Sequence, residues 1–182
     1  MGRIVSNFFI SLDGVVERPD QWHFPYFDDA MGEIVGRGME TCDAFLMGRT
    51  LYGEWSDYWP GNQDDGFGPF INNIPKYVVS TTLDESDVTW NNTTLVHGDV
   101  EARLREIKES TPRDIGISGS ATLVRSLLAM GLLDELALLV HPIAVGSGHR
   151  LFEDTPTHPL RLTSHRALDT GVLHLTYEPV RG

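Results

Sequence analysis

Two places in this sequence have the residue types and spacing to bind an anion. In the first, the apolar run Ile115–Ile117 leads through Ser118-Gly119-Ser120 into a helix whose apolar residues, within Leu123–Leu128, recur on one face. The first N–H groups of a helix lack internal partners and carry partial positive charge, and small residues let a phosphate approach them. This stretch could therefore hold the phosphates of a nucleotide. The alternative is an ordinary strand-to-helix turn capped by Ser118 or Ser120.

The second junction adds side chains that suit a phosphate. The buried-strand pattern Asp43–Met47 runs into Gly48-Arg49-Thr50 and then into a helix. A guanidinium and a hydroxyl at a helix start can both bind phosphate oxygens. One such junction is common in α/β proteins, but two in one small domain suggest that two phosphate regions of a single ligand are held.

A third candidate follows the strand pattern Lys76–Val79. Ser80-Thr81-Thr82 places three hydroxyls at the carboxyl end of that strand. They could contact a sugar or a phosphate, or they could end the strand with local side-chain hydrogen bonds. The sequence leaves both interpretations open.

The elements that must position these residues alternate along the chain. Strands are expected at Arg3–Ile10, Asp43–Met47, Lys76–Val79, Thr94–Val96, Ile115–Ile117 and Asp134–Val145, then in a hairpin of Leu160–Leu168 and Val172–Pro179. Helices are expected from Asp28 or Asp29 to Thr41, after Gly48, at Phe67–Asn73, from Asp99 to Lys108, and from Ser120 to Gly131. This order predicts one α/β domain over residues 1–182, with a mixed sheet and helices on both faces. Within the longest strand, Pro142 predicts a bulge or an edge.

Composition narrows the class of partner. The formal charge is −12, and the only lysines are Lys76 and Lys108. A nucleic acid or an anionic membrane would call for a basic surface, so neither is expected as a partner. Cys42 is the single cysteine, which rules out an intramolecular disulfide and fits a reducing compartment. No apolar run approaches the roughly 20 residues of a membrane span, and no signal peptide is evident, so we expect a cytoplasmic protein.

Several chemistries do not fit this sequence. The histidines show no paired-ligand spacing and one cysteine cannot complete a zinc site, so no metal is expected and each histidine is assigned to the surface or to a cap. Gly116–Ser120 lacks the last glycine of a nucleophile elbow. Neither a phosphate loop ending in Gly-Lys-Ser/Thr nor a Gly-x-Gly-x-x-Gly fingerprint is present. If a nicotinamide cofactor binds, it binds outside the Rossmann pattern.

A series of motifs, taken in order, resembles one known family. They are Asp43–Tyr52, Pro75–Ser80, Ile117–Val124, and Gly131–Leu136 followed by Pro142, Gly146-Ser147-Gly148 and Leu151-Phe152. From Arg3 to Pro179 the chain resembles the RibD C-terminal domain family, the reductase half of a bifunctional riboflavin-biosynthesis protein. The resemblance implies the dihydrofolate reductase fold, a three-layer α/β/α arrangement with a mixed, mostly parallel sheet and antiparallel C-terminal strands. It also implies a stand-alone version of that domain, without the zinc deaminase half.

The same resemblance implies NADPH as the cofactor and suggests which residues bind it. The matching positions are Gly48, Arg49 and Thr50 for the first phosphate-binding turn, Val79, Ser80 and Thr81 for the region near the adenosine 2′-phosphate, and Ser118, Gly119, Ser120, Ala121 and Thr122 for the second turn. Ser11 and Asp13 match the loop that lies over the nicotinamide and the substrate. Trp22 is a further candidate for substrate contact.

Hydride transfer also needs a proton source. Trp22–Asp28 resembles the Trp-x-x-Pro-x-Asp of dihydrofolate reductase, with one extra residue before the acid, so Asp28 is a candidate catalytic acid. Asp13 is the rival acid, and the alternative for Asp28 is a helix cap. A substrate that carries a ribose phosphate would need basic residues, for which Arg18, Arg37 and Arg150 are available.

The leading functional hypothesis is an NADPH-dependent reductase of a small heterocycle, resembling the 5-amino-6-(5-phosphoribosylamino)uracil reductase of riboflavin biosynthesis. A dihydrofolate (pterin) reductase, or a reductase of another carbonyl or imine, is the second hypothesis. A non-catalytic nucleotide-binding dimeric domain is the third. The resemblance also suggests a homodimer, and the apolar run Leu136–Val145 is a candidate for its contact surface.

Overall fold

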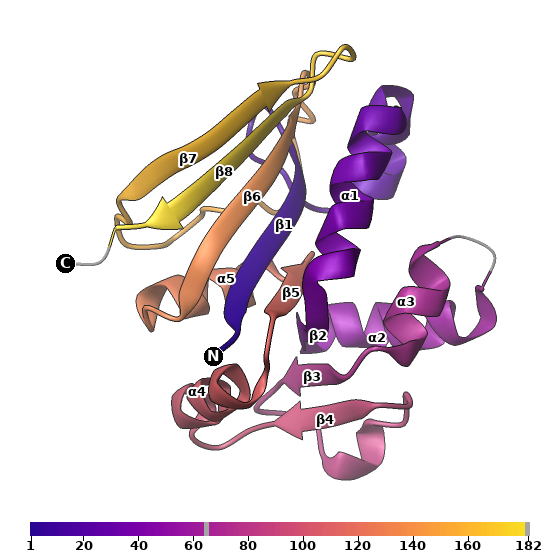
Figure 1. Ribbon diagram of the computed structural model, residues 1–182, viewed down its shortest axis with the longest axis vertical. Helices are drawn as coiled ribbons and strands as arrows, with labels where there is room; N and C mark the ends of the chain where they lie inside the picture. Colours follow the sequence, from indigo (N-terminus) through magenta and orange to yellow (C-terminus); the bar gives the residue numbers. More distant parts are fainter. Residues whose placement is uncertain (64–65, 181–182) are drawn as a thin grey trace.

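The computed structural model describes residues 1–63 and 66–180 (Figure 1). Its strands are β1 (Arg3–Ser11), β2 (Cys42–Gly48), β3 (Lys76–Val79), β4 (Thr93–Val96), β5 (Asp114–Ser118), β6 (Leu133–His141), β7 (Leu160–Ala167) and β8 (Leu173–Pro179). Its α-helices are α1 (Asp29–Thr41), α2 (Arg49–Tyr58), α3 (Phe67–Asn73), α4 (Val100–Ser110) and α5 (Ala121–Ala129). Short 3-10 turns lie at Pro19–Gln21, Phe24–Tyr26, Trp59–Gly61 and Glu85–Asp87.

The strands of the described chain pair into one sheet in the order β4-β3-β2-β5-β1-β6-β8-β7. Every pair from β4 to β6 is parallel, whereas β8 runs antiparallel to both β6 and β7. The sequence prediction of a mixed, mostly parallel sheet with antiparallel C-terminal strands is confirmed. Parallel strands need helical crossovers, and the direction of each crossover decides which face its helix covers.

Alternation along the strands gives each face of the sheet its own core. On one face, Leu46 of β2 packs with the apolar residues of α4 and α5. On the other face, Phe45 and Met47 pack against α2 and α3, while Met31 of α1 packs against Leu139 of β6. The result is a three-layer arrangement, with α1, α2 and α3 on one side of the sheet and α4 and α5 on the other.

Strand β6 is shorter than the sequence predicted, because the strand ends at His141 although the apolar pattern continues to Val145. Pro142 has no N–H to give to the ladder. The following N–H groups bond locally or to another loop: that of Ile143 donates to the His141 carbonyl at 2.8 Å, and that of Val145 donates to the Asp13 carboxylate at 3.0 Å. Pro142 is therefore a strand end that turns the chain toward the loop after β1.

The β6 part of the apolar run Leu136–Val145 does not form an exposed surface. Strand β6 lies between β1 and β8, and Leu136, Leu138 and Leu139 are buried within the chain's own core. The β6 part of this run is therefore unavailable for a subunit contact, since its side chains pack within the chain's own core; a contact through the exposed Pro142 and Ala144, and the homodimer itself, stay predictions. In the part of the chain that the structure describes, no helix combines the length and apolar character needed to cross a membrane.

The end of α3 depends on a buried lysine. Lys76 is fully buried, and its Nζ donates to the carbonyls of Ile71 at 2.9 Å and Ile74 at 3.0 Å. The ammonium also lies 4.6 Å from the ring centroid of Trp90. Burial lowers the pKa of Lys76 to about 8. The charge is retained at neutral pH because two carbonyl oxygens and an aromatic face replace its water.

Replacing Lys76 with Met should lower the free energy of unfolding by about 1–3 kcal/mol, because buried carbonyls at the end of α3 would lose their donor. Urea unfolding followed by circular dichroism measures the difference. The control is Arg103→Met on the exposed face of α4, where we expect a change within about 0.5 kcal/mol. Equal effects of the two substitutions would contradict the role assigned to Lys76.

Candidate functional site

The segments that the sequence assigned to a cofactor meet at one edge of the sheet. Strands β3, β2, β5 and β1 are adjacent and parallel, so their carboxyl ends lie side by side (Figure 1). Thr81 follows β3, Arg49 follows β2, Ser118 ends β5 and Asp13 follows β1. Strand β2 continues into α2 on one face, whereas β5 continues into α5 on the other. Neighbouring strands whose connections leave to opposite faces form the crevice in which open α/β sheets bind ligands.

The two strand-to-helix turns touch each other. The Gly48 N–H donates to the Ser120 Oγ at 3.0 Å. Ser120 stands at the N-cap of α5, yet its hydroxyl makes no bond to that helix. The alternative in which the Ser120 side chain caps its own helix is therefore wrong, because that side chain is bound to the other turn.

Close contact between the turns also explains the glycine between the two serines. Gly119 has a φ of 67°, a left-handed conformation that costs other residues energy. A β-carbon at this position would lie 3.1 Å from Cδ1 of Leu51 in α2. Glycine at position 119 thus lets the start of α5 approach the start of α2.

Helices α2 and α5 both begin without a side-chain cap. At α1 and α4, the carboxylates of Asp28 and Asp99 accept N–H groups of the first turn, but α2 and α5 have no such bond. Their first N–H groups are open to an anion. Arg49 adds an exposed guanidinium that makes no hydrogen bond or ion pair with any described residue.

A hollow of about 450 Å³ opens beside the start of α2. Its lining includes Arg49, Thr50 and Gly53 of α2 together with Leu83 and Asp87 of the β3–β4 connection. The β3–β4 connection begins at the hydroxyls that the sequence associated with a 2′-phosphate. The hollow therefore joins two of the segments assigned to the cofactor.

The hydroxyls after β3 divide between the two interpretations that the sequence left open. Ser80 is buried, and its Oγ accepts the N–H groups of Thr82 and Leu83, each at 3.1 Å. Val79 is half-buried against the core. Thr81 is exposed. Ser80 thus shapes the turn, whereas Thr81 and Thr82 are both exposed, and the Thr82 hydroxyl lies 3.4 Å from the Ser80 Oγ.

The middle of the central strand is open to solvent. Asn7 lies in β1 with partners on both sides, Ser118 of β5 and Ala137 of β6, yet it is exposed. A central strand between two packed layers normally buries such a position. The helical layer therefore leaves a gap over Asn7, next to the turn that begins α5. The sequence analysis missed Asn7; a polar residue inside an apolar strand pattern was the available signal.

Asp13 joins two loops at the end of β1. Its carboxylate accepts the Ser11 hydroxyl at 2.6 Å and the N–H groups of Val145 and Gly146 at 3.0 and 2.8 Å. The hydrogen bonds from Ser11, Val145 and Gly146 lower the pKa of Asp13 to about 2. The Arg150 guanidinium donates to the Asp13 carbonyl at 3.0 Å. Asp13 is therefore ionised at neutral pH and holds the loop after β1 against the loop after β6.

An aromatic cluster fills the space beneath the loop that follows β1. The ring of Phe9 stacks on His23 with centroids 4.5 Å apart. The ring of His141 makes T-shaped contacts with Trp22 and with Tyr26. His23 and His141 are 6 % and 0 % exposed, so their assignment to the surface or to caps is wrong. His141 faces inward because it continues the alternation of Ala137 and Leu139 along β6. Trp22 is buried in this cluster too, and its indole N–H donates to the Glu17 carbonyl at 3.2 Å.

Burial leaves both histidines neutral. It lowers the pKa of His23 and of His141 below the ordinary value of 6.5, and for His23 the neighbouring His141 adds to the effect. The Nδ1 of His141 bonds the Leu139 carbonyl at 2.8 Å. Nδ1 of His23 and Nε2 of His141 have no hydrogen-bond partner among the described residues. The aromatic cluster therefore contains two buried imidazole nitrogens without a hydrogen-bond partner among the described residues.

Asp28 caps α1, as one of the two interpretations of the sequence expected. Its Oδ1 accepts the Met31 N–H at 2.8 Å. Within the described chain its Oδ2 makes no hydrogen bond or ion pair, so this oxygen is available to a ligand. A catalytic role for Asp28 stays a prediction.

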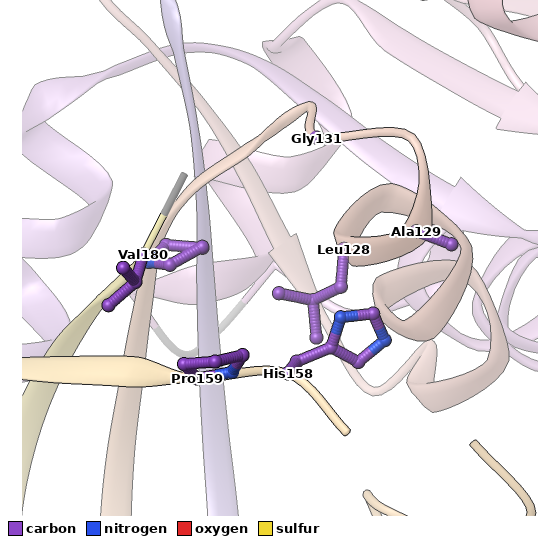
Figure 2. A pocket seen from close by; sticks show the side chains of 7 residues that line it. Leu128, Ala129, Gly131, His158, Pro159 and Val180 are labelled. Carbon is purple, nitrogen blue, oxygen red and sulfur yellow. The ribbon is translucent and has the colours of Figure 1, made fainter. Parts of the chain in front are cut away.

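A second hollow, of about 380 Å³, lies at the opposite edge of the sheet. Figure 2 shows the Leu128 side chain at the end of α5 beside the ring of His158, and Ala129, Pro159 and Val180 also line this hollow. Since α5 begins at the edge that holds the candidate site, its last residues are a helix length away. This hollow is therefore separate from the site. Elsewhere too, no group of three or more His, Cys, Asp or Glu side chains within residues 1–63 and 66–180 is gathered as a metal ion would need.

The bridge through Asp13 should make the protein sensitive to acid. The pKa of Asp13 is lowered in the folded state from 3.8 to about 2, so its contribution is complete above pH 3.8 and is lost as the pH falls toward 2. Urea unfolding of the parent and of Asp13→Asn should differ most at pH 5 to 7 and converge as the pH approaches 2. Asp57→Asn in α2 is the charge-matched control, and a constant difference over the whole range would refute the assignment.

The chain is similar to a known protein family and to a bacterial relative. Residues 3–174 match the family model described as the RibD C-terminal domain. The chain is 27% identical over 181 residues to the uncharacterized protein YyaP of Bacillus subtilis (strain 168), covering 96% of this chain and 94% of the relative.

Two solved structures share the fold of this chain. A putative riboflavin biosynthesis protein from Shewanella sp. PV-4 superimposes with a TM-score of 0.78 at 18% identity, covering 98% of this chain and 99% of that one. Dihydrofolate reductase from Enterococcus faecalis, complexed with NADP(H), gives a TM-score of 0.62 at 14% identity, covering 97% and 96%. The fold is therefore that of dihydrofolate reductase, and the chain belongs to the RibD C-terminal domain family.

Proposed function

We propose that this chain is an NADPH-dependent reductase of a small heterocycle of the riboflavin-pyrimidine or pterin type. The observation that carries the proposal is the contact between the two uncapped helix starts, Gly48–Leu51 and Ser118–Thr122, with the unpaired Arg49 beside them. Membership of a reductase family and the likeness to a reductase that binds NADP(H) support the choice of cofactor.

The residues at the carboxyl edge fit a dinucleotide with two phosphate regions. The N–H groups that begin α2, with Arg49 and Thr50, would hold one region, and those that begin α5 would hold the other. The Ser120 Oγ accepts the Gly48 N–H, so its own hydroxyl proton is free to donate to a phosphate oxygen. The exposed Thr81, two residues before Leu83 of the hollow's lining, would contact a further phosphate on the ribose.

The nicotinamide ring and the substrate ring would meet over Asn7, where β1 is exposed. Bound NADPH would supply a hydride from the C4 position of its nicotinamide. Asn7 and Ser118 are register partners next to the α5 turn, so a ring that enters from that turn lies over them. The Asn7 amide offers both a donor and an acceptor for orienting such a ring.

Hydride transfer also requires a proton, for which Asp13 and Asp28 are the two candidate acids. A group with a pKa of about 2 is almost entirely ionised at neutral pH, so Asp13 is a poor proton donor. We therefore assign Asp13 to loop positioning and propose that Asp28, whose Oδ2 makes no hydrogen bond or ion pair, relays a proton from water as a carboxylate.

Replacing Arg49 with Ala should weaken NADPH binding at least about tenfold, because an exposed, unpaired guanidinium is removed from the phosphate site. The measurement is a titration of NADPH fluorescence. Arg103→Ala, which removes the same charge from α4, should leave the affinity unchanged. Unaltered affinity in Arg49→Ala, or no NADPH binding by the parent, would favour a domain without this cofactor.

We also propose a homodimer, now placed on the outer hairpin. Strand β7 is the edge strand, its residues after Leu160 are all exposed, and Leu162 and Leu173 are 46 % and 43 % exposed. An exposed edge with apolar side chains favours pairing with a second copy. Sedimentation equilibrium at micromolar concentration should give the dimer mass for the parent and the monomer mass for Leu162→Glu. A monomeric parent would end this proposal.

A further inference from the structure

The helix starts at the carboxyl edge of the sheet differ in their local charge. Helices α2 and α5 begin there with no acidic residue in the first turn and no side-chain cap. Helix α1 begins beside them with Asp28 as its cap and Asp29 in its first turn. The two carboxylates cancel the partial positive charge of that helix start. An anion is therefore favoured at α2 and α5 and disfavoured at α1.

The segment that covers the α1 side is strongly acidic. Between Ser11 and Arg37 the chain has six carboxylates and two arginines. One of these, Arg18, is paired with Asp20 at 3.3 Å. The facing loop contributes Arg150, but its guanidinium is held by the Asp13 carbonyl at 3.0 Å and lies 3.8 Å from the Asp13 carboxylate. Both nearby arginines are thus already occupied by acids of the same loops.

The other lysines and arginines considered for this side are engaged or distant. Arg125 of α5 donates to the carbonyls of Arg150 and Leu151 at 3.2 and 3.0 Å. Lys76 and Lys108 are buried and bonded inside the fold. Arg37 is exposed but lies eight residues into α1, roughly 12 Å along the helix from the strand edge. Arg166 lies on β7, three strands from β1 and so about 14 Å away. Arg49 belongs to the cofactor half.

The wall on this side suits an uncharged ring. Phe9 follows Asn7 by two residues and so faces the same side of the sheet. Its ring stacks with His23, which lies close to Phe24 and Phe27, with ring centroids 4.2 and 6.0 Å away. Phe24 and Phe27 are 64 % and 47 % exposed. His23 and His141 are buried beneath these exposed rings, and burial lowers the pKa of both, so they support the aromatic wall without adding positive charge.

We infer that the substrate half of the cleft takes an unphosphorylated heteroaromatic molecule, such as a ribosylaminopyrimidine or a pterin, and rejects its phosphate ester. The inference rests on the proposed reductase function and names the substrate class within it. Phosphate recognition is confined to the cofactor half, where α2, α5 and Arg49 lie. In the substrate half, a phosphate dianion would meet Asp13, Glu17, Asp28 and Asp29 without a free cation to balance it.

The test compares 5-amino-6-(ribosylamino)uracil with its 5′-phosphate on the NADPH-loaded protein. Isothermal titration should give a dissociation constant about tenfold or more lower for the unphosphorylated molecule, because the dianion is repelled by nearby carboxylates. The difference should shrink as salt is raised from 0.05 to about 0.5 M, since salt screens that repulsion. Equal binding, or tighter binding of the phosphate ester, overturns the inference.

A charge variant probes the cause of the preference. Asp20→Asn releases Arg18 and removes one negative charge, so the preference should fall by about threefold. Glu109→Gln removes the same charge from the exposed end of α4 and should leave the preference unchanged. Equal effects of the two variants would overturn the electrostatic argument.

The two hypotheses can fail separately. If NADPH binds but neither pyrimidine does, the inference about the substrate is wrong and the cofactor site survives. If NADPH does not bind, the proposed function is wrong. The same pair of pyrimidines titrated into the cofactor-free protein then still decides whether the acidic half rejects the phosphate.

Discussion

The site depends on the contact between the turn after β2 and the turn after β5. The single hydrogen bond from the Gly48 N–H to the Ser120 Oγ joins segments 72 residues apart in the sequence. It forms because the parallel order β2-β5 places both carboxyl ends at one edge, and because glycine at position 119 lets Leu51 approach. A larger residue at 119 would separate the two helix starts, and each would then be an ordinary helix start with no shared ligand.

A second connection closes the other half of the cleft. Asp13 accepts hydrogen bonds from Ser11 at the end of β1 and from Val145 and Gly146, so the loops after β1 and β6 are held together. Pro142 makes this possible by ending β6 and directing the chain toward Asp13. The aromatic cluster beneath then orders the irregular stretch from Val15 to Phe27, which has little regular secondary structure to hold it. Tertiary contacts thus add to the short-range backbone hydrogen bonds of these turns in ordering the loops.

An acidic protein can bind a multiply charged cofactor by distributing its charges. With a net charge of −12, the chain as a whole repels anions. Locally, the dipoles of α2 and α5 and one free guanidinium create a favourable strip along part of one edge. The carboxylates around α1 begin immediately beside this strip. Such a boundary orients a ligand that is charged at one end and aromatic at the other, because each end is favoured in only one half.

The sequence by itself determined the element order, the fold class and the residues at both helix starts. Those features are local: apolar spacing decides strand or helix, and small residues at a strand end mark a turn whatever surrounds it. The family resemblance then supplied the fold and a cofactor for these turns, and the fold is confirmed. The same local reasoning extended β6 to Val145 and assigned Leu136–Val145 to a subunit contact, because apolar periodicity does not reveal which neighbour covers a strand.

Only the tertiary structure decided which side chains are free and which are engaged. Asp13 and Arg150 are chemically able to serve a ligand, but each is already bonded to a residue far away in the sequence. His23 and His141 are polar and were assigned to the surface, yet strand alternation and loop packing bury them together. Asn7 looks like an interior strand position and is exposed. Long-range contacts set burial and pairing, and these decide which residues at the edge can act on a substrate.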